Sequence, residues 1–87
     1  MKKKLQKRAL SDGNKVFTPK SGTTVYINYS YTFRKLEVKF RGDRIYHYKN
    51  VEPLVWEEYK SIIQSGGSSG VFVNKKIKPF YEADEIE

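Results

Sequence analysis

The stretch Leu36–Tyr48 reads LEVKFRGDRIYHY, and it decides the fold of this chain. Apolar and polar residues alternate over 36–40, which is typical of a strand with one buried face. Gly42-Asp43 is a turn sequence, and the β-branched and aromatic residues that follow it favour a second strand. The stretch therefore predicts an antiparallel β-hairpin with strands at about 36–41 and 44–49.

The length of the hairpin loop determines which side chains share a face, because a change of one residue turns every side chain over. A loop of two or four residues suits the turn sequence but places Lys49 on the apolar face. A loop of three or five residues sets Val38 opposite Tyr46 and Leu36 opposite Tyr48. An unpaired lysine in a core is costly, so we expect the odd or bulged loop. Both tyrosine rings then lie on the packed face, and the outer face is basic.

Two further apolar patterns complete the predicted fold. Residues 23–31 are β-branched and aromatic, which indicates a strand, while apolar residues at 55, 59 and 62 repeat at helical spacing behind Pro53. Gly66-Gly67 ends this helix, and the apolar residues of 71–81 are too many to leave in water. Val16–Pro19 could dock as a short edge segment. We predict an α+β fold: a three-stranded antiparallel sheet (about 23–31, 36–41 and 44–49), a covering helix (about 53–65) and a short C-terminal helix (about 70–78).

Charge is distributed unevenly along the 87 residues, and the net charge is +7, from 17 basic and 10 acidic residues. Five basic groups lie in residues 1–8 and four acidic groups in 82–87, which leaves twelve basic and six acidic groups, a net charge of +6, in residues 9–81. We predict a basic disordered arm at 1–15, a single domain at 16–81 and an acidic tail at 82–87 that frays. A basic folded part favours a polyanionic or acidic partner.

The residue types exclude several kinds of site. Cysteine is absent and His47 is the single histidine, so the chain has no disulfide, no thiolate zinc site and no histidine metal cluster. No residues stand at a spacing that supports acid–base or nucleophilic catalysis. We expect a protein that is not an enzyme and that needs no metal or other cofactor. No apolar run has the length of a membrane span, and we expect a cytoplasmic location.

Basic residues interleaved with aromatic rings indicate a nucleic-acid surface. His47 lies mid-strand without a catalytic partner, and we interpret it as a solvated or stacking residue. Ser68 or Ser69 is expected to cap the short helix, and an anion bound near Gly70 is the alternative interpretation. The predicted nucleic-acid-binding residues are Lys39, Arg41, Arg44, His47, Lys49, Lys75, Lys76 and Lys78.

An ordered set of motifs follows the hairpin: Tyr46-His47-Tyr48, then Ser68-Ser69-Gly70, then Asn74-Lys75-Lys76-Ile77, then Tyr81. This set resembles the KTSC domain, which is named after the C-terminal region of some lysyl-tRNA synthetases and also occurs as a free-standing bacterial or phage protein. Two positions depart from the pattern, since Glu52 precedes Pro53 and Val73 replaces an aromatic residue. The resemblance, over about 25–81, implies structural or stacking roles for Tyr46, Tyr48, Ser68, Gly70, Asn74, Ile77 and Tyr81.

The resemblance implies RNA binding, because the family also occurs attached to a tRNA-handling enzyme. Together with the basic groups, it leads us to expect a non-catalytic nucleic-acid-binding module, with RNA preferred over DNA. Phosphates would contact the basic groups, and bases would stack on tyrosine or histidine rings. The alternative is a protein-interaction module, such as a small phage or bacterial regulator that docks on an acidic protein surface.

Overall fold

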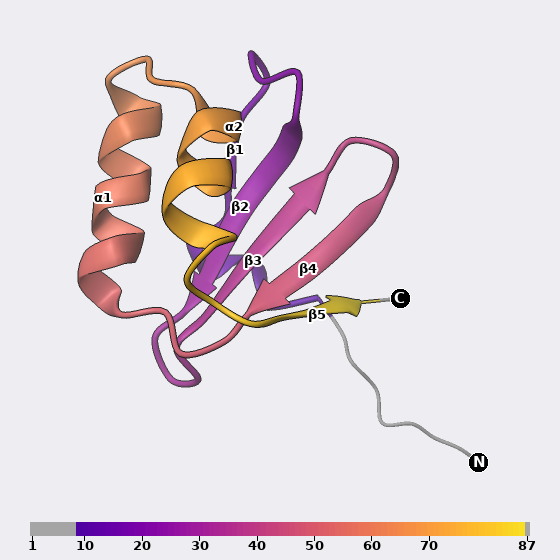
Figure 1. The fold of residues 1–87 in the computed structure, drawn as a ribbon, viewed down its shortest axis with the longest axis vertical. Coiled ribbons are helices and arrows are strands. Elements are labelled where there is room, and N and C mark those ends of the chain that lie inside the picture. Colours follow the sequence, from indigo (N-terminus) through magenta and orange to yellow (C-terminus); the bar gives the residue numbers. More distant parts are fainter. Residues whose placement is uncertain (1–8, 87) are drawn as a thin grey trace.

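Five antiparallel strands form one sheet in the computed structural model, which describes residues 9–86 (Figure 1). The strands lie side by side in chain order. Helices connect β4 to β5 and cover one face of the sheet, and a 3₁₀ turn precedes β1. The elements are η1 (Asp12–Asn14), β1 (Val16–Phe17), β2 (Thr24–Ser30), β3 (Lys35–Phe40), β4 (Arg44–Tyr48), α1 (Pro53–Gln64), α2 (Ser69–Phe72), the π-helical turn η2 (Val73–Ile77) and β5 (Ala83–Ile86).

The β3–β4 hairpin has the odd register that the sequence predicts. Val38 lies opposite Tyr46, and the last pair before the turn leaves three residues, 41–43, in the loop. Gly42 has a φ of +90° and Asp43 a φ of +62°. Glycine enters this left-handed region freely, and aspartate tolerates it better than most residues. The burial of the apolar face therefore outweighs the preference of Gly-Asp for a two-residue turn.

The core lies between the sheet and the helices. Trp56 of α1 stacks on Tyr29 of β2 with ring centroids 5.4 Å apart, and Tyr59 stacks on Phe72 at 4.3 Å. Ile77 of η2 is fully buried in the same cluster. Fully burying one large apolar side chain contributes about 1.5–3 kcal/mol. Both predicted helices are confirmed in position, at Pro53–Gln64 and over 69–77, and so is the α+β class.

The sheet has five strands rather than the predicted three. β1 is the edge segment anticipated at 16–19, and it pairs with β2 through Val16 and Ile27. β5 lies in the acidic tail, which we expected to fray. Ala-Asp-Glu-Ile has weak strand propensity, but Ile86 is buried and β5 pairs with β4 along four residues. Tertiary pairing therefore makes a strand from a segment whose own sequence does not favour one.

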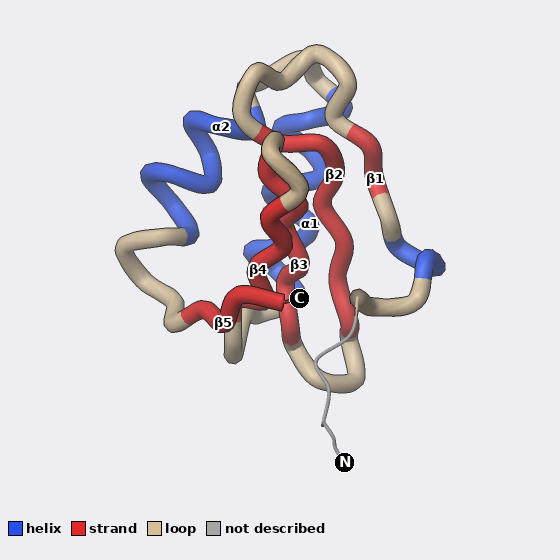
Figure 2. The backbone as a smooth tube through the Cα atoms, turned by 90° about the vertical axis from the view of Figure 1, so that its right-hand side faces the viewer, coloured by secondary structure: helices blue, strands red, loops and turns tan. Residues whose placement is uncertain are grey.

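The predicted disordered arm is described only in part. Residues 1–8, which hold its five basic groups, lie outside the described residues. For residues 9–15 the expectation of disorder is wrong, because this segment is hydrogen-bonded to the sheet. The backbone N–H of Leu10 donates to Glu37 at 2.8 Å, and the amide of Asn28 donates to the carbonyl of Ser11 at 2.9 Å. Figure 2 shows η1 on the side of the sheet away from α2.

Candidate nucleic-acid interface

Strand alternation divides the predicted basic residues between the two faces of the sheet. Arg44 shares the helix-covered face with both hairpin tyrosines, whereas Lys39 and Lys49 lie on the opposite face. Lys39 pairs with Asp43 at 3.5 Å. Lys75 and Lys76 of η2 and Lys78 directly after it are exposed. Arg41 is also exposed, and it donates a hydrogen bond to the carbonyl of Ser21. The eight predicted residues therefore do not form one continuous patch.

His47 is buried, which corrects the expectation of a solvated or stacking residue. Its Nε2 lies 2.8 Å from Oε2 of Glu37, the residue opposite it in the sheet. Asn28 and the backbone N–H of Leu10 donate to the same carboxylate. Burial raises the pKa of Glu37, but the hydrogen bonds from His47, Leu10 and Asn28 outweigh it and hold the pKa below its usual value. His47 therefore ties the sheet together and does not face a surface ligand.

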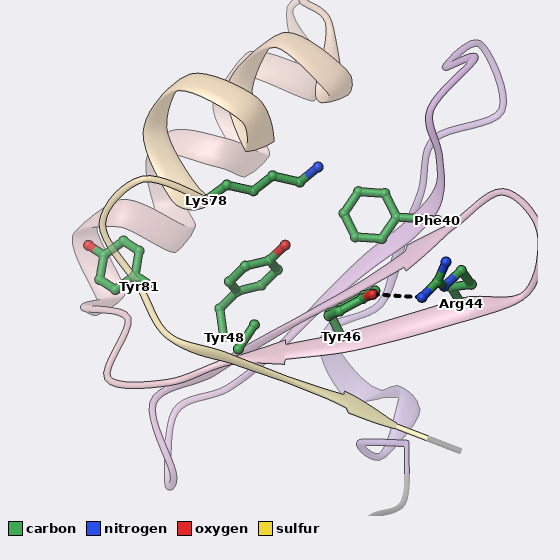
Figure 3. A pocket seen from close by; sticks show the side chains of 7 residues that line it. Phe40, Arg44, Tyr46, Tyr48, Lys78 and Tyr81 are labelled. Atoms are coloured by element: carbon green, nitrogen blue, oxygen red, sulfur yellow. Dashed lines mark hydrogen bonds between the residues drawn. The ribbon is translucent and has the colours of Figure 1, made fainter.

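A pocket of about 430 Å³ opens on the helix-covered side of β4 (Figure 3). The hairpin supplies its aromatic floor, Lys78 extends over it from the end of η2, and the chain entering β5 closes a third side. Five of the residues that the sequence singled out meet here. The lining residues are Phe40, Arg44, Tyr46, Tyr48, Lys78, Tyr81 and Ala83.

The pocket combines aromatic rings with cations. Phe40 and Tyr46 pack edge to face with centroids 5.6 Å apart, and Nζ of Lys78 lies 5.1 Å from the centre of the Phe40 ring. The guanidinium of Arg44 lies 5.9 Å from the centre of the Tyr46 ring. Apolar rings next to a positive charge suit a ligand that carries both a ring and an anionic group.

Tyr48 forms the floor of the pocket and points its hydroxyl into it (Figure 3). The residue is only 4% exposed, and burial, with a smaller contribution from Tyr46, raises its pKa to about 12. The hydroxyl therefore keeps its proton at neutral pH and is a hydrogen-bond donor to a ligand. Both tyrosine rings lie on the packed face, as the odd register predicts.

β5 places acidic groups against two of the predicted phosphate contacts. Glu85 forms an ion pair with Arg44 at 3.1 Å, and Asp84 forms one with Lys49 at 3.3 Å. The hydrogen bond from Arg44 is the main reason that the pKa of Glu85 lies below its usual value. Arg44 is thus part of the pocket and bound to a carboxylate of the same chain.

Both serines of Ser68-Ser69-Gly70 have structural roles. Ser68 caps α2, since its Oγ accepts a hydrogen bond from the N–H of Val71 at 3.1 Å. Ser69 is buried, and its Oγ lies 2.7 Å from the hydroxyl of Tyr59 and 2.8 Å from that of Thr24. These contacts join α1, α2 and β2, and they favour the capping interpretation of the motif.

Gly70 allows the backbone of α2 to pack closely against the loop before β2. A Cβ at this position would lie 2.6 Å from Oγ1 of Thr23, so the backbone of α2 rests directly on the loop before β2. The next two motif residues, Asn74 and Ile77, differ in exposure. Ile77 is fully buried, whereas Asn74 is exposed on η2 and does not line the pocket.

The sequence analysis did not assign two of the lining residues, Phe40 and Ala83, nor Glu85, the ion-pair partner of Arg44. Phe40 ends the alternating stretch on the same face as Val38, so the alternation was the signal that could have placed it beside Tyr46. Glu85 has no such signal, because its segment has neither a strand pattern nor a turn that fixes a register.

Two kinds of feature are absent from the part of the chain that the structure describes. Within residues 9–86 no group of three or more acidic residues or histidines is arranged to hold a metal ion. None of the helices in this range has the length and apolar character of a membrane span.

The fold and the pocket define a small α+β domain that presents rings and cations beside the central hairpin of its sheet. The chain belongs to the KTSC domain family, which matches residues 20–81. It is similar to the crystal structure of a KTSC domain protein from Yersinia pestis, with 28% identity and a TM-score of 0.63 over 77% of this chain and 89% of the other. No curated protein matches the chain. The family resemblance is thus confirmed, and β1 and β5 lie outside the matched residues.

Proposed function

We propose that the chain is a non-catalytic module that binds single-stranded nucleic acid, RNA in preference to DNA, in the pocket between β4 and η2. The observation that carries the proposal is the meeting of four aromatic rings with Arg44 and Lys78 in one concave site. An unstacked base would lie against the rings, and its neighbouring phosphates would contact the cations. The net positive charge of the chain supports the same class of partner.

The shape of the pocket favours a single strand over a duplex. The donor hydroxyl of Tyr48 lies on the floor, below the level of Lys78 (Figure 3). A base that is paired and stacked in a helix cannot reach such a group without leaving the stack, which costs a few kcal/mol. The preference for RNA rests on the family's link to lysyl-tRNA synthetases and not on a contact.

The proposal is tested by fluorescence anisotropy with a labelled single-stranded RNA of about 12 nucleotides. Log affinity should fall linearly with log salt, by roughly 0.7 for each phosphate neutralised. Lys78→Gln removes a charge from the pocket, and Lys75→Gln removes the same charge from outside it. We expect the first change to weaken binding at least about threefold more than the second.

Two results would contradict the proposal. A flat salt dependence would show that phosphates are not the main contacts, and equal losses for the two lysine variants would show that the pocket is not the site. A DNA strand of the same sequence and a duplex RNA are run beside the single-stranded RNA. Equal affinity for all three would remove the stated preference.

A further inference from the structure

We propose that Arg44 and the hydroxyl of Tyr46 form a phosphate-binding site, and that the carboxylate of Glu85 fills this site when no ligand is bound. The inference rests on the proposed function of the pocket and assigns one of its phosphate contacts. It also gives β5 a role as an internal competitor of the ligand. Both statements follow from the contacts of Glu85.

The carboxylate of Glu85 is held as a phosphate group would be. Nε of Arg44 donates to Oε2 at 3.2 Å, and Nη2 of Arg44 donates to Oε1 at 3.1 Å. The hydroxyl of Tyr46 donates to the same Oε1 at 3.4 Å. The guanidinium fork matches a carboxylate and a phosphate in the same two-point geometry. An anion site is therefore built at the rim of the pocket, and its occupant belongs to the chain itself.

The occupant is held loosely enough to be exchanged. The side chains of Arg44 and Glu85 are 60% and 46% exposed, so water and salt screen their attraction. Ion pairs of this kind contribute little to stability, because both charges are well solvated when apart. A nucleic acid that brings several phosphates and a stacking base gains contacts that one carboxylate does not have.

The placement of β5 supports the competition. β5 is an edge strand of four residues with β4 as its sheet neighbour, and it lies outside the residues that match the family. Besides the ion pair of Glu85 with Arg44, β5 supplies the ion pair of Asp84 with Lys49, and its Ala83 lines the pocket. Two acidic groups of one strand thus meet two of the predicted phosphate contacts.

The test compares two variants that each remove one negative charge from the same segment. Glu85→Gln releases Arg44, whereas Glu82→Gln changes an exposed residue that is not part of the pocket lining. We expect Glu85→Gln to bind the single-stranded RNA about 2- to 5-fold more tightly than the unmodified chain. Its log–log salt slope should be steeper by about 0.7, the contribution of one further phosphate contact. An equal gain for Glu82→Gln would overturn the proposal, because overall charge alone would then explain it.

Arg44→Gln, made in the unmodified chain and in Glu85→Gln, shows whether the gain in RNA affinity depends on Arg44. In the unmodified chain the substitution should weaken RNA binding less than in the Glu85→Gln background, since there the ligand must first displace Glu85 from Arg44. In the Glu85→Gln background it should remove the gain. An equal loss in the two backgrounds would overturn the competition between Glu85 and the ligand.

A titration with pyrophosphate, followed by the NMR signal of the Arg44 Nε–H, separates this inference from the proposed function. The signal should move at a lower pyrophosphate concentration in Glu85→Gln than in the unmodified chain. If it does so while no variant binds RNA, the phosphate site stands and the proposed function fails. If the signal does not move in Glu85→Gln, the phosphate site is wrong. Thermal melts of all variants verify that β5 substitutions leave the fold intact.

Discussion

His47 and Glu37 face each other across strands β3 and β4, with Nε2 of the histidine 2.8 Å from Oε2 of the carboxylate, and both side chains are buried. The same carboxylate holds Leu10 and therefore the segment that covers this face of the sheet. One buried anion thus connects two strands and the chain before β1. Removing this charge should therefore lower the stability of the whole fold.

We expect Glu37→Gln to lower the free energy of unfolding by about 1–3 kcal/mol, because the amide leaves at least one buried donor without an acceptor. The measurement is urea-induced unfolding followed by tryptophan fluorescence of Trp56. Glu58→Gln on the exposed face of α1 is the matched control, and it should change stability by no more than about 0.5 kcal/mol. A loss of similar size in the control would show that the buried network carries no special weight.

The pH dependence of stability should contain a contribution from Glu37. Its pKa in the folded state is lowered from the ordinary value of 4.5. A lowered folded-state pKa means that the unfolded chain binds the proton more readily. The contribution is therefore complete above the unfolded value and is lost as the pH falls through the folded value. Unfolding free energies measured from about pH 6 to about pH 3 should fall more steeply for the unmodified chain than for Glu37→Gln.

Glu57 and Glu85 also have pKa values held below the usual one, chiefly by hydrogen bonds from Tyr31 and Arg44 respectively. Both residues are present in the unmodified chain and in Glu37→Gln, so the difference between the two curves reports the Glu37 carboxylate together with the contacts it makes. Parallel curves over the acid range would contradict the assignment.

Two substitutions at Tyr48 should separate its ring from its hydroxyl. Tyr48→Ala removes a buried ring and should destabilise the fold by about 3–5 kcal/mol. Tyr48→Phe keeps the ring on the packed face and removes the donor in the pocket, so the melting temperature should change little while RNA affinity falls. A Tyr48→Phe protein that binds RNA as tightly as the unmodified chain would show that the hydroxyl makes no contact with the ligand.

Gly70→Ala should destabilise the domain by about 1–3 kcal/mol, because the new methyl group would overlap the hydroxyl of Thr23. Replacing Thr23 by Ala removes that hydroxyl. The double variant should therefore recover part of the loss, and the double-mutant cycle measures how much. Independent, additive effects of the two substitutions would show that the clash is not the cause.

The sequence predicts the centre of this fold better than its edges. Hydrophobic alternation fixes the hairpin register, since placing Val38 opposite Tyr46 buries apolar area that the other register would expose. Helical spacing places α1, and the short helix follows from apolar residues that must be covered. These are local patterns with one physical solution.

The edges depend on partners that are distant in the chain. β5 is a strand because it pairs with β4 and buries Ile86, and neither segment shows this pairing by a pattern of its own. His47 is buried because Leu10 and the residues around it cover the face that alternation left polar. The sequence of a polar strand face does not show whether solvent or another segment of the chain covers that face.

The order of the strands also has a consequence for the folding pathway. β1 to β4 follow one another in the sheet as they do in the sequence, so each pairing closes only a short loop, whereas the two helices lie between β4 and β5. Short loops cost less chain entropy to close. We therefore expect the four-strand meander to be formed in the folding transition state and β5 to join after it. Substitutions in β5 such as Ile86→Val should then speed unfolding and leave the folding rate nearly unchanged, which stopped-flow chevron plots would reveal.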